Sequence, residues 1–269
     1  MNDPIARVRV TLDRPAALDE ARVILAARCL AALGLDSSSY RRAAAVTSSV
    51  GLSLAGIVRP LDEFAATASG YRSVVAPRNN LRDGATGDPL PPEVNEALCP
   101  EGATETSLAI PGLGTVGAPT EGCIARAVAT IFGSVKDWLV ADQFVVAGVR
   151  QFSSEALRHP DVVAAAADYA RRMSAAGYVF ANPAEAAQFA RKRWIEDDSD
   201  GVASADEIAM AQADARCQGQ TRIYEVIDGV LLALARDWLV ANGATVLRAA
   251  EIHERAVAFA TRLVEQERE

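Results

Sequence analysis

The chain has 269 residues, of which half are hydrophobic and 23% are charged, and its formal net charge is −8. This composition is typical of a folded globular protein of one or two domains and excludes a disordered chain. The acidic balance argues against nucleic acid as the main partner and favours a basic protein partner. No apolar run approaches the roughly 20 residues of a membrane-spanning helix, and residues 1–10 lack the apolar stretch of a signal peptide.

The first part of the chain, residues 1–118, contains most of the glycine and proline and predicts an irregular, loop-rich lobe. Residues 7–12 alternate weakly between polar and apolar and predict a short strand. Residues 16–33 predict a helix, because apolar residues recur at helical spacing and Gly34 is a typical C-terminal stop. Residues 61–69 predict a second, short helix.

The second part, residues 119–269, predicts an almost entirely helical region that ends in long helices. Two helix starts are marked by capping sequences, Asn182–Glu185 and Ser204–Glu207. Residues 208–264 then carry apolar stripes at helical spacing. The expected fold class is therefore mainly α: a multi-helix, bundle-like layer with an irregular N-terminal lobe, together forming one compact unit.

Residues 196–207 form the strongest metal-binding pattern. An EF-hand loop places oxygen ligands at positions 1, 3, 5, 7, 9 and 12 and glycine at position 6. With Gly201 at position 6, four carboxylates take positions 1, 3, 5 and 12: Glu196, Asp198, Asp200 and Glu207. Glu at position 1 and Ala203 at position 8 depart from the pattern. The same residues also fit an acidic turn and a helix cap, so both interpretations stay open.

The four cysteines, Cys29, Cys99, Cys123 and Cys217, are too far apart in sequence for a C-x-x-C metal or redox motif. A zinc site is not expected, because neither of the two histidines lies near a cysteine. Two interpretations remain: thiols of a cytoplasmic protein, or two disulfides of an exported one.

Candidate catalytic residues are scarce. The two histidines, His159 and His253, have no nucleophile beside them in sequence. Residues 112–117 match G-x-G-x-x-G, but Pro111 and Pro119 flank the match, so we expect a surface loop rather than a dinucleotide site. The leading hypothesis is a non-enzymatic protein that binds a protein or peptide partner. The alternative is a carboxylate- or metal-dependent enzyme, with calcium at residues 196–207 as its cofactor.

Several short motifs are shared with one known group of proteins: Arg28-Cys29-Leu30, Gly70-Tyr71, Gly122-Cys123, Gly177-Tyr178, Pro183-Ala184-Glu185-Ala186, and Glu207-Ile208-Ala209 followed by Asp214 and Cys217. From about residue 18 onward, the order of these motifs resembles uncharacterised actinobacterial proteins that are exported and often lipid-anchored. The resemblance implies an extracytoplasmic location and brings no catalytic residue with it.

The resemblance also implies a disulfide pairing. The group has a cysteine where this chain has Arg172, and Cys99 is an additional cysteine here. If Cys99 replaces the missing partner of Cys123, the pairs are Cys29–Cys217 and Cys99–Cys123.

Overall fold

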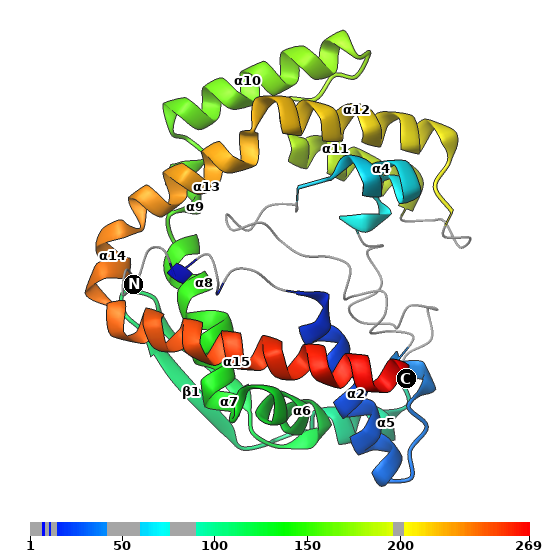
Figure 1. Ribbon diagram of the computed structural model, residues 1–269, viewed down its shortest axis with the longest axis vertical. Coiled ribbons are helices and arrows are strands. Elements are labelled where there is room, and N and C mark those ends of the chain that lie inside the picture. Colours follow the sequence, from blue (N-terminus) through cyan, green and yellow to red (C-terminus); the bar gives the residue numbers. More distant parts are fainter. Residues whose placement is uncertain (1–6, 9–10, 12–14, 42–59, 76–89, 196–201) are drawn as a thin grey trace. The chain divides into compact units, whose positions relative to one another are not determined.

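The computed structural model describes residues 7–8, 11, 15–41, 60–75, 90–195 and 202–269 (Figure 1). The mainly α fold class is confirmed, and the chain forms two compact units, each assembled from separate stretches of sequence. Unit 1 comprises residues 1–48, 82–151 and 235–269, and unit 2 comprises residues 49–81 and 152–234. The boundary expected at residue 118 lies inside unit 1, because the C-terminal helix packs on helices from the first half of the chain.

Unit 1 is built around three mutually contacting helices, α2 (Ala16–Ala32), α6 (Gly122–Phe132) and α15 (Gly243–Arg268) (Figure 1). Their shared core is rich in alanine, which allows close approach of the helix backbones. It consists mainly of Ala21, Ile24, Ile131, Ala256, Ala260, Leu263 and Val264. The short helix α5 (Pro92–Leu98) covers one end of α2 and α6.

The helical stretch over residues 122–150 is interrupted once and continues with different geometry. Helix α6 ends at Gly133, which has a φ of 96°, and the Ser134 hydroxyl then accepts a hydrogen bond from Asp137 N at 2.9 Å. The interruption therefore falls at residues 133–134. The next elements are α7 (Val135–Trp138), the π-helical turn η3 (Leu139–Phe144) and α8 (Val145–Arg150).

The glycine-rich stretch forms an antiparallel hairpin of β1 (Glu105–Ile110) and β2 (Gly114–Pro119), rather than the expected loop. Gly112 and Gly114 have φ values of 83° and 96°, a backbone region that glycine adopts readily at tight turns. The hairpin is anchored within unit 1 because Trp238 Nε1, from α14 (Arg236–Ala241), donates to Pro111 O at 3.0 Å.

Unit 2 is organised around α12 (Ala205–Thr221), which contacts α4 (Glu63–Ser69), the 3₁₀ turn η1 (Gly70–Ser73) and α10 (Pro160–Ala175). The remaining elements are α9 (Ser153–Ala156), α11 (Pro183–Ala190), the π-helical turn η4 (Arg191–Ile195) and α13 (Ile223–Leu234). Both predicted caps are confirmed: Asn182 Oδ1 accepts from Glu185 N at 3.0 Å, and Ser204 Oγ accepts from Glu207 N at 3.2 Å.

One expectation about secondary structure is corrected. The described residues Arg7, Val8 and Thr11 are helical, so the predicted strand over 7–12 is wrong there. Val8 and Thr11 are both buried, and their spacing of three residues is that of one side of a helix. The long helical pattern over 208–264 is divided into α12 to α15, with Arg222 in the left-handed conformation between α12 and α13.

Candidate functional site

A buried polar cluster occupies the centre of unit 2, with the Asp214 carboxylate at its hub. Oδ2 accepts a hydrogen bond from the Tyr71 hydroxyl at 2.6 Å. Oδ1 accepts one from the Tyr169 hydroxyl at 2.7 Å and another from Gln218 Nε2 at 2.8 Å. The amide oxygen of Gln218 accepts from Leu61 N at 2.9 Å, so the cluster ties α12 to η1, to α10 and to the chain before α4.

Burial sets the electrostatics of this cluster. It raises the pKa of Asp214, although the three donors favour the charged carboxylate. Burial and the nearby Asp214 also raise the pKa of both Tyr71 and Tyr169, so both hydroxyls keep their protons and act as donors. Asp214 has no solvent exposure, which means that its carboxylate is not presented to a substrate.

Glu207 forms a second buried contact two turns before the hub, and it too has no solvent exposure. Its Oε1 accepts from Tyr71 N at 3.2 Å and its Oε2 accepts from Arg72 Nη2 at 3.3 Å. Gly70 has a φ of 58°, and a Cβ atom there would lie 2.8 Å from Glu207 Oε1. The backbone of η1 therefore approaches the carboxylate at a position that requires glycine.

The sequence contains a signal for this cluster. Glu207, Asp214 and Gln218 stand at spacings of seven and four, which place them on one face of a helix. Met210 and Ala211 lie on the same side and are buried. Polar residues on an apolar helix face indicate buried hydrogen-bonded groups, and the capping-box interpretation of Glu207 concealed them.

Of the four predicted calcium ligands, Glu196, Asp198 and Asp200 lie outside the described residues. The fourth, Glu207, is turned into the core of unit 2 with Tyr71 and Arg72 as partners. Within the part of the chain that the structure describes, no group of three or more His, Cys, Asp or Glu residues could hold a metal. Calcium at 196–207 stays a prediction.

The disulfide pairing implied by the resemblance is wrong. The structure joins Cys29 to Cys123, with 5.6 Å between their Cα atoms, and leaves Cys99 and Cys217 as thiols. The reason is the packing of unit 1: α2 lies along α6 and brings Cys29 to the start of α6. Cys217 lies in α12 of unit 2, where burial raises its pKa.

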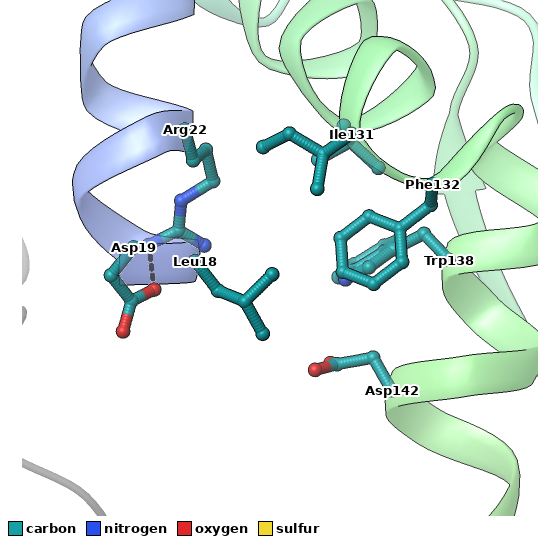
Figure 2. Close-up of a pocket in the computed structure, with 8 residues that line it drawn as sticks. Leu18, Asp19, Arg22, Ile131, Phe132, Trp138 and Asp142 are labelled. Atoms are coloured by element: carbon teal, nitrogen blue, oxygen red, sulfur yellow. Dashed lines mark ion pairs between the residues drawn. The ribbon is translucent and has the colours of Figure 1, made fainter. Parts of the chain in front are cut away.

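A small hollow lies in unit 1 between α2 and the helices from α6 to η3 (Figure 2). Leu18 and the ion pair of Asp19 with Arg22, at 3.0 Å, face the aromatic rings of Phe132 and Trp138 across it. Its volume is about 30 Å³. A buried water needs roughly 10–15 Å³, whereas small-molecule sites occupy about 300–1,000 Å³. The hollow therefore has room for water and not for a metabolite.

Three aromatic rings of unit 2 contact one another at its surface, and together with the exposed Val179, which directly precedes the first of them in the chain, we call them the aromatic face: Phe180, Phe189 and Trp194. The ring of Phe189 lies 5.4 Å from that of Phe180 and 5.7 Å from that of Trp194, measured between centroids. Phe180 and Trp194 pack on the core of unit 2, while Val179 is 87% exposed and Phe189 is 44% exposed.

Within the described residues of η4, just after Phe189, the exposed charges are positive. Lys192 and Arg193 in η4 are exposed, three and four residues after Phe189. Glu185, one turn before Phe189, accepts hydrogen bonds from Ala181 N and from the Asn182 side chain. The outward-facing cations therefore contrast with the net charge of the chain, which is −8.

Comparison of the chain with models of protein families, with curated proteins and with solved structures finds no match. Among the helices that the structure describes, none combines the length and the apolarity needed to cross a membrane.

Proposed function

We propose that this protein is a non-enzymatic, extracytoplasmic binding protein that takes an acidic, apolar peptide segment of a partner protein on the aromatic face of unit 2. The observation that carries the proposal is the exposed ring of Phe189, which contacts the rings of Phe180 and Trp194 that pack on the core. Val179, directly before Phe180 in the chain, is exposed as well. Aromatic side chains held rigidly at a surface contribute large apolar contact area at low entropic cost, and they are enriched in protein interfaces.

Charge complementarity supports an acidic partner segment. Lys192 and Arg193 border the aromatic face and would meet carboxylates of a docked peptide. An acidic segment differs from the basic partner that the net charge of the chain favours. The local charges take precedence here, because a docked segment responds to charges within about one Debye length, roughly 8 Å at physiological salt.

The disulfide supports the extracytoplasmic part of the proposal. Disulfides persist in oxidising compartments and are rare in the cytoplasm of mesophiles, where thiols are kept reduced. The resemblance to exported actinobacterial proteins agrees with this location. Alkylation of thiols in intact cells, before lysis, should leave Cys29 and Cys123 unlabelled; labelling of both would place the protein in a reducing compartment.

The binding proposal is tested with two labelled amphipathic peptides that share the same apolar residues. One carries Glu at all polar positions and the other carries Lys. Fluorescence anisotropy should show tighter binding of the Glu peptide, with an affinity that falls as salt is added. Preference for the Lys peptide, or no binding of either peptide, would contradict the proposal.

Substitution locates the binding surface. The double variant Val179→Ser with Phe189→Ser should weaken binding of the Glu peptide about tenfold or more, as loss of an interface anchor does. Val163→Ser is the matched control, because Val163 is an exposed apolar residue on α10 of the same unit. Circular dichroism should show the same helix content in both variants. An equal loss in the control would mean that the aromatic face is not the binding surface.

A further inference from the structure

The end of α5, where Cys99 follows Leu98, packs near the start of α6, where the disulfide joins Cys123 to Cys29 of α2. Figure 1 shows α2, α5 and α6 together in unit 1. A Cβ atom at Gly122 would lie 2.5 Å from Leu98 O and 2.6 Å from Pro100 Cδ. Leu98 and Pro100 flank Cys99, and Gly122 directly precedes Cys123. The backbone that carries the exposed thiol of Cys99 therefore lies against the backbone that carries one sulfur of the disulfide.

The three sulfurs differ in their access to solvent. Cys99 is exposed at the C-terminal end of α5, Cys29 is half-buried in α2, and Cys123 is buried, with 1% exposure. Reagents in solution therefore meet Cys99 before they meet the disulfide. Cys99 is also the free thiol whose two chain neighbours pack on Gly122, the residue directly before Cys123.

We propose that these cysteines form a thiol–disulfide exchange site, in which Cys99 takes the place of Cys29 as the partner of Cys123. Cys99 loses its proton to water, and its thiolate sulfur forms a bond to Cys123 Sγ. The bond between Cys123 and Cys29 breaks, and its electron pair stays on Cys29 Sγ, which takes up a proton. One thiol and one disulfide are present before and after the exchange, so no oxidant or reductant is consumed.

The exchange changes which helices are tied together. In the structure, the disulfide holds α2 against α6. After the exchange, the chain following α5 is held to the start of α6, and α2 is released from its covalent tie. The exchange thus changes the cross-linking of unit 1 without a net change in its number of thiols and disulfides.

The variant Cys29→Ser tests whether Cys99 reaches Cys123. Protein purified in a glutathione redox buffer is trapped with N-ethylmaleimide and digested without reduction, and the peptides are identified by mass spectrometry. We expect a Cys99–Cys123 disulfide and a labelled Cys217. A labelled or glutathione-bound Cys123, or a disulfide between Cys123 and Cys217, would overturn the proposal.

Wild-type protein provides a second test if Cys29→Ser does not fold. It is incubated at alkaline pH without oxidant and then trapped in the same way. We expect a fraction with N-ethylmaleimide on Cys29 and a disulfide between Cys99 and Cys123. The matched control Cys99→Ser should show no label on Cys29. Label confined to Cys99 and Cys217 in the wild type, however long the incubation, would also overturn the proposal.

Discussion

Removing the hydroxyl of Tyr71 should destabilise unit 2 more than removing that of Tyr169, although both donate to Asp214. Among the described residues, Asp214 Oδ2 accepts from Tyr71, whereas Oδ1 accepts from both Tyr169 and Gln218. Tyr71→Phe therefore leaves a fully buried oxygen without a donor, which costs about 2–3 kcal/mol. Tyr169→Phe leaves Oδ1 with the Gln218 amide as a donor, so we expect the free energy of unfolding to fall by only about 1 kcal/mol.

The free energies of unfolding are measured by urea titration, with helix content followed by circular dichroism. Tyr178→Phe is the matched control, because it is the same chemical change on a ring that packs on the same core and stays partly exposed. It should shift the free energy of unfolding by less than about 0.5 kcal/mol. Equal losses for Tyr71→Phe and Tyr169→Phe, or losses no larger than that of the control, would refute the assignment of Asp214 as a buried hub.

Three further predictions concern other contacts. Burial raises the pKa of Asp214, so its contribution to the free energy of unfolding is complete below the unfolded pKa of about 3.9 and is lost as pH rises through the folded pKa. The stability of Asp214→Asn relative to wild type should therefore increase from pH 4 to pH 8. A difference that stays constant with pH would contradict the raised pKa. Gly148→Ala should destabilise unit 1 by about 1–3 kcal/mol in thermal or urea unfolding, because the added Cβ would lie 2.0 Å from the Trp238 ring. Gly219→Ala is the control, because its Cβ meets nothing within 4 Å, and it should stabilise α12 by about 0.5–1 kcal/mol. A change of the same sign in both variants would refute the close contact of Gly148 with Trp238. The disulfide of unit 1 links residues 94 positions apart, and its reduction should lower the free energy of unfolding by up to about 4.7 kcal/mol in the chain-entropy account, so an unchanged urea midpoint after reduction would contradict its structural role.

The sequence by itself determined the local features of this protein. The helix of residues 16–32 follows from apolar spacing before Gly34, and the starts of α11 and α12 follow from Asn182 and Ser204. These features depend on residues a few positions apart, because capping and helical periodicity are satisfied within one or two turns. The mainly α fold class followed from the same local signals.

Tertiary structure alone decided which distant segments meet. The resemblance implied a pairing of Cys29 with Cys217, but α2 packs along α6 and sets Cys29 beside Cys123. The local sequence predicts Glu207 as a capping residue. In the structure Glu207 is also a buried acceptor for Tyr71 N, because η1 packs on α12. Such contacts join residues more than 90 positions apart, and they are selected by the fit of whole helix faces, a property that no short stretch of sequence contains.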